Sequence, residues 1–133
     1  PDLQALLGSP APDTAALMAG LRACDALTAA TRQVLEEVDV LVTPTTPITA
    51  VPIGQESVSY GGVEEPVLMA MIRCTAPFNA SHLPALSLPC GFSRAGLPVG
   101  LQIVGRPLDE RLVLRVGHAY ERSMDWHLRS PDL

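Results

Sequence analysis

The segment from residue 75 to residue 105 places the strongest constraint on the fold of this chain. Its sequence, TAPFNASHLPALSLPCGFSRAGLPVGLQIVG, holds two apolar runs, Ala85–Leu88 and Val99–Val104, on either side of a stretch rich in glycine and proline. Short apolar runs with such boundaries are typical of strands, and glycine and proline favour a sharp connection. The pattern predicts a strand, a turn and a second strand, and it contains no obvious set of reacting side chains.

A long amphipathic helix is predicted from Asp13 to about Val38. Asp13 follows a proline and can cap the first turn, and the alanine-rich stretch from Ala15 to Ala30 favours helix by propensity. One face of this helix would carry Leu17, Leu21, Cys24, Thr28, Thr31, Leu35 and Val38. Residues 1–12 are rich in turn formers and are expected to be loose.

Short elements and a long loop are predicted next. Residues 39–43, DVLVT, lack polar alternation, which predicts a strand covered on both faces and closed by Pro44. Residues 47–66 predict a long loop with a small hairpin around Val58–Val63. A second helix is predicted over Pro66–Thr75, and it is so apolar that it must be buried or line an apolar cavity.

A last helix is predicted from Glu110 to about Arg122, with Asp109 in position to cap it. Its expected buried face consists of Leu112, Val116, Ala119 and Tyr120. No internal repeat or domain boundary is visible in the sequence.

Charge and composition exclude several classes of function. The net charge is −5 and the basic residues are scattered, so a nucleic-acid groove is not expected. No apolar run is long enough to span a membrane. The chain is 47% hydrophobic and only 17% charged, an apolar excess that indicates a surface covered by other polypeptide. Because the first residue is Pro and not Met, we expect a truncated or processed product.

Candidate chemical groups fail when they are considered one at a time. Cys24, Cys74 and Cys90 lack CxxC spacing and are expected to be buried, reduced thiols. Ser81 and His82 are adjacent, whereas a nucleophile and its base usually meet in space from distant positions. The three separated histidines do not predict a metal site, and the glycines do not fit a dinucleotide-binding pattern. We therefore expect no catalytic residue, metal or cofactor here.

Three blocks of the sequence resemble the C-terminal part of amidase-signature enzymes. They are DVLVTPTTP at 39–47, the segment 75–105 and DERLVLRVGHAYER at 109–122, in the order and spacing of that family. The resemblance covers about residues 13–127. It implies an α/β fold, a mixed β-sheet flanked by helices, of which residues 1–133 would be a single C-terminal segment. His82 departs from the family pattern N-x-x-G-x-P-A, and its side chain is expected to crowd or alter the turn.

The family hydrolyses carbon–nitrogen bonds with a Ser–cis-Ser–Lys triad, in which the lysine takes a proton through the bridging serine. The nucleophilic serine forms an acyl-enzyme, and backbone N–H groups hold the oxyanion. This chain contains no lysine and no Gly-Gly-Ser-Ser run, and arginine cannot act as the base. The resemblance thus implies that the catalytic residues lie in an N-terminal portion and that this chain alone is inactive.

By resemblance, the predicted helix over Pro66–Thr75 lines the acyl pocket of the enzyme. Met69, Ile72 and Arg73 are then the candidate substrate-binding residues. In tRNA-dependent amidotransferase A subunits, an Asp stands at about the position of Ile72 and contacts the glutamine amide. Ile72 therefore favours a less polar acyl group.

The leading interpretation is a C-terminal fragment of a cytoplasmic amidase that hydrolyses a carboxylic amide to an acid plus ammonia or an amine. This fragment would supply sheet strands and part of the pocket wall. One alternative is a non-catalytic module that pairs with another chain, and another is a tRNA-dependent amidotransferase A subunit with a partner B subunit. The expected ligand of the full-length protein is a small-molecule amide. The expected protein contact is a second copy or the N-terminal portion of the same enzyme.

Overall fold

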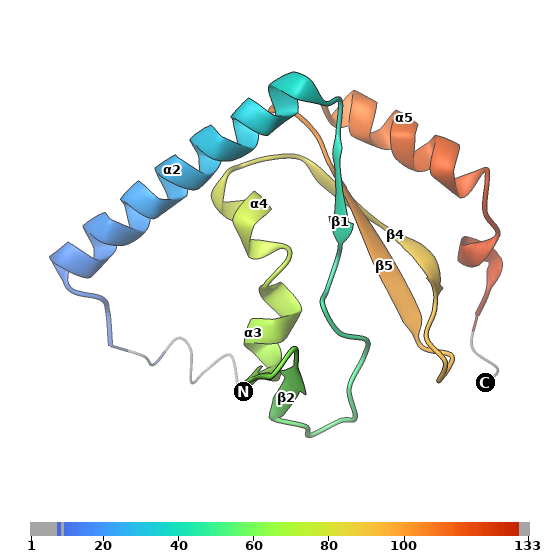
Figure 1. Ribbon diagram of the computed structural model, residues 1–133, viewed down its shortest axis with the longest axis horizontal. Coiled ribbons are helices and arrows are strands. Elements are labelled where there is room, and N and C mark those ends of the chain that lie inside the picture. Colours follow the sequence, from blue (N-terminus) through green and yellow to red (C-terminus); the bar gives the residue numbers. More distant parts are fainter. Residues whose placement is uncertain (1–7, 9, 131–133) are drawn as a thin grey trace.

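Three antiparallel strands form the centre of the molecule (Figure 1). They are β1 (Leu41–Pro44), β4 (Ala85–Phe92) and β5 (Pro98–Val104), and β5 lies between the other two. The structure is a computed structural model that describes residues 8 and 10–130. Strands and flanking helices confirm the predicted α/β fold class.

The predicted strand, turn and strand of residues 75–105 are confirmed as the β4–β5 hairpin. Strand β4 is longer than the predicted apolar run, because it continues past a bulge between Pro89 and Gly91. A proline is tolerated there, since a bulge interrupts the ladder of hydrogen bonds. The turn is closed by the Ser93 amide, which donates to the Leu97 carbonyl at 2.8 Å.

The long predicted helix is confirmed as α2 (Thr14–Glu37). The Asp13 carboxylate caps it by accepting a hydrogen bond from a backbone amide of the first turn at 2.7 Å. Only the C-terminal part of its predicted apolar face is covered: Leu35 is 1% exposed, whereas Leu21 is 52% exposed. The loose stretch predicted for residues 1–12 lies mostly outside the described residues.

Arg106 ties the C-terminal end of α2 to the chain that leaves β5. Its Nε donates to the Leu35 carbonyl at 2.8 Å, and its Nη2 donates to the Val38 carbonyl at 3.1 Å. The last carbonyls of a helix have no partner within the helix, so these bonds satisfy acceptors that would otherwise need water. One side chain thus fixes where the long helix ends.

The main hydrophobic core draws on five separate parts of the chain. Leu35, Leu83 and Val104 are buried together, and Leu41 and Phe78 pack against them. They come from α2, the turn before β4, β5, β1 and the short helix α4 (Ala76–Ala80). This core joins the C-terminal end of α2 to α4, β1 and β5.

Strand β1 forms as predicted but is less covered than predicted. It pairs with β5 from Leu41↔Val104 to Pro44↔Leu101 and lies at one edge of the sheet. Val42 is 57% exposed, so the prediction of a strand covered on both faces is wrong for the described residues. An apolar side chain on an open sheet face is available for contact with further polypeptide.

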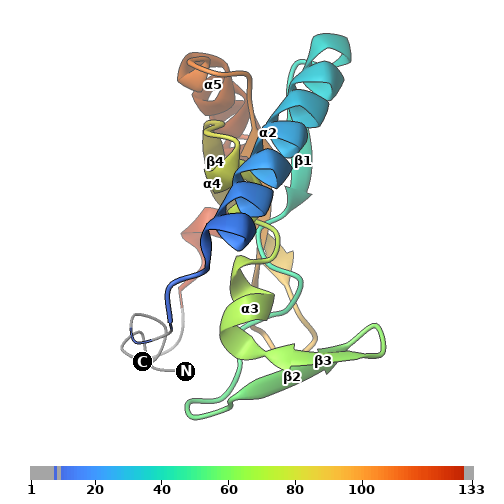
Figure 2. The ribbon, with the colours of Figure 1, turned by 90° about the vertical axis from the view of Figure 1, so that its left-hand side faces the viewer.

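The predicted small hairpin is confirmed as β2 (Ser57–Tyr60) and β3 (Val63–Pro66). It projects beyond the foot of the short helix α3 (Val67–Ile72), as Figure 2 shows. The Val67 amide donates to the Glu56 carbonyl at 2.9 Å, which joins the start of α3 to the residue before the hairpin.

The helix predicted over Pro66–Thr75 is confirmed in part as α3, which ends at Ile72, and a second short helix, α4, follows it. After α3 the chain makes a turn and starts again as α4, an element that the sequence pattern does not indicate. Pro77 explains the break, because a proline is tolerated in the first turn of a helix but not in its interior. The expected burial is also incomplete: Ala70 is buried, but Met69 and Ile72 are partly exposed.

The last helix is confirmed as α5 (Glu110–Glu121), which lies against β4 and β5. Its buried residues are Val113 and Gly117, whereas Ala119 is exposed, so this part of the predicted face is wrong. The Asp109 side chain makes no capping hydrogen bond, contrary to prediction; its backbone carbonyl accepts from the Val113 amide at 3.3 Å.

A 3₁₀ turn, η1 (Trp126–Leu128), follows α5 and returns to the sheet. The Trp126 ring lies 6.1 Å from the Phe92 ring of β4, with the two planes inclined by 57°. None of the helices in the described part of the chain is both long enough and apolar enough to cross a membrane.

Candidate functional site

A shallow apolar groove runs between α2, α3 and α4. Its lining residues are Leu27, Met69, Ile72, Arg73, Ala76, Pro77 and Ala80. Its volume of about 430 Å³ falls within the range of small-molecule sites. Among the described residues that line it, Arg73 alone carries a charge. The groove is therefore suited to an apolar group with one polar end.

The structure brings the three predicted substrate-binding residues together. Met69 and Ile72 lie one helical turn apart on α3, and Arg73 is the C-cap of that helix. All three border the same groove. Leu27 of α2 forms part of its lining, and periodicity alone does not indicate that this residue meets α3.

The turn between α3 and α4 is anchored to the sheet by a buried glutamine of β5. Gln102 is almost fully buried, and its Nε2 donates to the Cys74 carbonyl at 3.0 Å and to Thr43 Oγ1 at 3.1 Å. A buried amide needs such partners, because leaving it unpaired costs free energy. Gln102 therefore holds the groove-lining turn in place, a role that its position in an apolar strand does not reveal.

Arg73 is held by a carboxylate of the neighbouring hairpin. Its Nε donates to Glu65 Oε1 at 3.0 Å, and its Nη2 contacts Glu65 Oε2, so the two side chains form a bidentate ion pair. The Tyr60 hydroxyl donates to Glu65 Oε1 as well. Glu65 is only 8% exposed, whereas the Arg73 side chain is 54% exposed. The pair thus links β2 and β3 to the end of α3.

The three groups shift one another's titration. The hydrogen bonds from Arg73 and then from Tyr60 hold the pKa of the Glu65 carboxyl below its ordinary value. The bond to Glu65, followed by burial, raises the pKa of the Tyr60 hydroxyl. The same carboxylate raises the pKa of Arg73. At neutral pH the network holds an ionised Glu65, a charged Arg73 and a neutral Tyr60.

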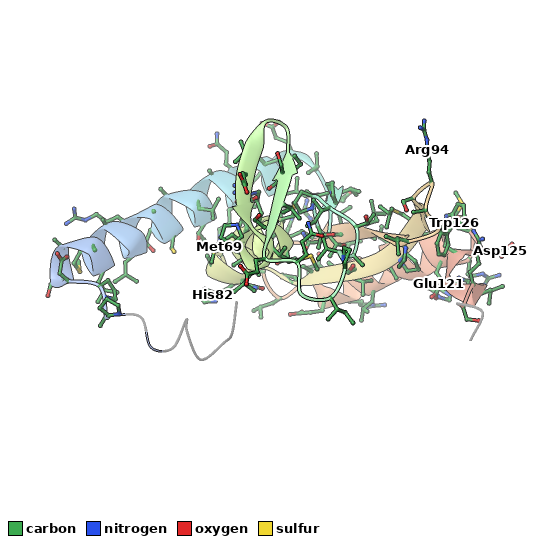
Figure 3. All side chains as sticks on the ribbon, turned by 90° about the horizontal axis from the view of Figure 1, so that it is seen from below. Met69, His82, Arg94, Glu121, Asp125 and Trp126 are labelled. Atoms are coloured by element: carbon green, nitrogen blue, oxygen red, sulfur yellow. The ribbon has the colours of Figure 1, made fainter. Side chains whose placement is uncertain are left out.

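Among the described contacts, the hydroxyl of Ser81 has a backbone partner and not the imidazole of His82. Ser81 is fully buried, and its Oγ donates to the Pro77 carbonyl at 2.9 Å. His82 is exposed at the end of α4 and lies on the same side of the molecule as Met69 (Figure 3). Figure 3 places Arg94 and Trp126 at the opposite end of the molecule from Met69 and His82.

Cysteines and metal-ligating clusters add nothing to the groove. Cys24, Cys74 and Cys90 are free, and each is partly exposed, so the prediction that they are buried is wrong. Within residues 10–130, no three His, Cys, Asp or Glu side chains come together in a way that could hold a metal ion. The described groove itself offers packing and one guanidinium.

Comparisons with known proteins place this arrangement in a family. The family described as Amidase matches residues 4–114. The glutamyl-tRNA(Gln) amidotransferase A subunit of Chloroflexus aggregans is 54% identical over 102 residues, which make up 76% of this chain and 20% of that protein. A solved amidase superposes with a TM-score of 0.71 at 34% identity, covering 76% of this chain and 23% of its own.

A second solved structure, the glutamyl-tRNA(Gln) amidotransferase A subunit from Thermotoga maritima, has a TM-score of 0.67 at 32% identity, over 81% of this chain and 22% of that one. The chain therefore belongs to the amidase-signature family of enzymes that act on carbon–nitrogen bonds. It spans about a fifth of the length of the curated relatives it matches.

Proposed function

We propose that this chain is the C-terminal part of an amidase that hydrolyses a carboxylic amide to an acid plus ammonia or an amine. It supplies strands β1, β4 and β5 to the sheet of the enzyme, and α3 and α4 form one wall of the acyl pocket. Family membership supports the reaction class. The groove that Met69, Ile72 and Arg73 share supports the location of the pocket wall.

The apolar lining of the groove carries the preference for a less polar acyl group. Ile72 has no group that could accept a hydrogen bond from an N–H group of a substrate such as glutamine. A polar substrate group buried against Met69 and Ile72 without partners loses its hydrogen bonds to water, which costs free energy. An aliphatic acyl chain instead gains by burying apolar surface there.

The chemical step requires residues that these 133 do not include. Amide hydrolysis by this family mechanism needs a lysine as the base, and all nine basic residues here are arginine. The chain on its own should therefore release no ammonia from any amide. The reaction belongs to the longer protein in which this sequence stands.

A panel of amide substrates, assayed with that longer protein, tests the proposal. The kcat/KM for ammonia release should be higher with butyramide than with glutamine. Ile72→Asp should lower the kcat/KM for butyramide. Met71→Asp is the matched control, because Met71 is similarly exposed on α3 but does not line the groove. A protein that hydrolyses glutamine and no simple amide would contradict the proposal.

The second candidate is the A subunit of a glutamyl-tRNA(Gln) amidotransferase, which the names and identities of the curated relatives favour. In that case the enzyme uses glutamine as its ammonia donor and works with a partner B subunit. Glutamine-dependent amidation of glutamyl-tRNA by the longer protein, seen only when a B subunit is added, would decide for this candidate. Hydrolysis of butyramide without any partner would decide for the first one.

A further inference from the structure

Arg73 uses only part of its hydrogen-bonding capacity within the described structure. A guanidinium carries five N–H groups, and the contacts with Glu65 engage Nε and Nη2. Among the described residues, Nη1 has no hydrogen-bond acceptor. The side chain is half exposed and borders the apolar groove. One edge of the guanidinium is therefore fixed, and the other is available to a ligand.

Glu65 is well placed to set the direction in which that free edge points. It is buried, its carboxylate receives two contacts from Arg73, and Tyr60 holds Oε1 from the neighbouring strand. A bidentate pair fixes both the position and the plane of the guanidinium, because its N–H groups form a rigid fork. A free arginine side chain would lose rotamer freedom on binding a ligand, and a side chain that is already held loses less.

We propose that Glu65 is a positioning residue that holds Arg73 at the edge of the groove, where Arg73 binds a carboxylate at the far end of the substrate's acyl chain. Charge complementarity selects this occupant, because within the described part of the chain the groove is lined by apolar residues and by one charged group, the Arg73 guanidinium. The substrate class is then the monoamide of an aliphatic dicarboxylic acid whose chain, unlike that of glutamine, carries no amino group to be buried against Met69 and Ile72. The inference rests on the proposed amide hydrolysis and specifies its substrate.

A purely structural role for the pair is the competing interpretation. In that case Glu65 and Arg73 only fasten the β2–β3 hairpin to α3, and no ligand meets the free edge of the guanidinium. The two interpretations differ in one measurable respect. A structural fastener affects all substrates equally, whereas a carboxylate site affects only substrates that carry the carboxylate.

The test uses the longer protein and two substrates that differ in one group. Glutaramate ends in a carboxylate where pentanamide ends in a methyl group. The wild-type KM should be about tenfold lower for glutaramate, as expected for a charge-assisted bidentate contact. Arg73→Lys keeps the charge but loses the fork, so it should remove most of this difference. The KM for pentanamide should change less than the KM for glutaramate, and an unchanged circular dichroism spectrum and thermal midpoint show that the variant folds.

Glu65→Asp tests the positioning role without changing charge. The shorter carboxylate cannot hold both nitrogens in the same place, so the KM for glutaramate should rise severalfold while its kcat changes little. Glu64→Asp is the matched control, since Glu64 is the preceding residue of β3 but is exposed and does not contact Arg73. Equal changes for both substrates, or no preference for glutaramate in the wild type, would overturn the proposal.

A binding measurement separates this inference from the proposed function. Calorimetric titration with glutarate needs no catalysis, and Arg73→Lys should weaken glutarate binding while Glu64→Asp leaves it unchanged. If the protein hydrolyses neither pentanamide nor glutaramate but binds glutarate through Arg73, the proposed amide hydrolysis is wrong and the carboxylate site is supported. If pentanamide is hydrolysed but glutarate does not bind, the carboxylate site is wrong and hydrolysis stands.

Discussion

His82 occupies a backbone position that favours glycine. Its φ is +54°, in the left-handed region, and the hydrogen bonds from the Leu83 amide to the Phe78 carbonyl and from the His82 amide to Asn79 form a Schellman turn at the end of α4. Glycine is the usual residue at this place, which explains why the family pattern N-x-x-G-x-P-A carries one. The turn persists here with a histidine, at a cost in backbone strain.

Replacement of His82 by glycine should therefore stabilise the protein. His82→Gly relieves the strain of the left-handed backbone, but glycine also has more freedom in the unfolded chain. The net increase in the free energy of unfolding should be up to about 1 kcal/mol. Urea unfolding measures it. Asn79→Gly is the control, because Asn79 is helical, and there the free energy of unfolding should fall slightly, by roughly 0.3 kcal/mol. A loss of stability in His82→Gly would contradict the strain argument.

At the scale of single elements, α5 approaches β4 so closely that one helix position has no room for a side chain. A Cβ atom at Gly117 would overlap the Leu86 side chain. Gly117→Ala should lower the free energy of unfolding by about 1–3 kcal/mol, the usual cost of overpacking. Gly20→Ala is the matched control in α2, because a Cβ there meets nothing within 4 Å. This substitution should raise the free energy of unfolding by about 0.5–1 kcal/mol. Thermal denaturation of both variants distinguishes close packing from helix propensity.

The junction between the β2–β3 hairpin and α3 should respond to acid. Because the folded-state pKa of Glu65 lies below its unfolded value of about 4.3, its ionised form contributes stability that is complete above about pH 4.3. That contribution is lost as the pH falls through the folded-state pKa. The stability difference between the wild type and Glu65→Gln should therefore be constant near neutrality and shrink in acid. Chemical denaturation at several pH values measures it, and Glu64→Gln controls for net charge.

Across the whole molecule, α2 divides into an anchored and an open part. Leu35→Ala should lower the free energy of unfolding by about 2–5 kcal/mol, because it empties a buried site, whereas Leu21→Ala should lower it by less than about 1 kcal/mol.

The isolated chain should also bind an apolar dye through its open surface, and Leu17→Gln with Leu21→Gln should reduce this binding. If the isolated chain forms a defined oligomer that binds no dye, the module interpretation is favoured over the fragment.

Local patterns are sufficient to predict most elements of this molecule. The α2 helix with its Asp13 cap, the β2–β3 hairpin and the β4–β5 hairpin follow from periodicity and turn residues that act within a few positions. The chain breaks between α3 and α4 because Pro77 can stand in the first turn of a helix but not in its interior. The apolar pattern upstream of Pro77 does not show that α3 already ends at Ile72. The predicted buried face of the last helix includes Ala119, but the close approach at Gly117 rotates the contact face.

The site is only partly predictable for a different reason. Met69, Ile72 and Arg73 lie close together in sequence, so a family resemblance can point to them as a group. Glu65 and Leu27 meet them through tertiary contacts, which depend on how the hairpin and α2 are placed. In the sequence Glu65 is an ordinary charged residue of a predicted loop, and nothing local distinguishes it from Glu64. Tertiary contacts of this kind leave no periodic signal in the sequence.

The edge position of β1 has a consequence for the order in which the chain folds. Strands β4 and β5 are joined by a short turn, whereas β1 pairs with a segment about 60 residues further along the chain. Closing the longer loop costs more conformational entropy, so the β4–β5 hairpin should form early and β1 should dock late, together with α2. Substitutions within the β4–β5 turn should therefore slow refolding, while substitutions in β1 should mainly speed unfolding.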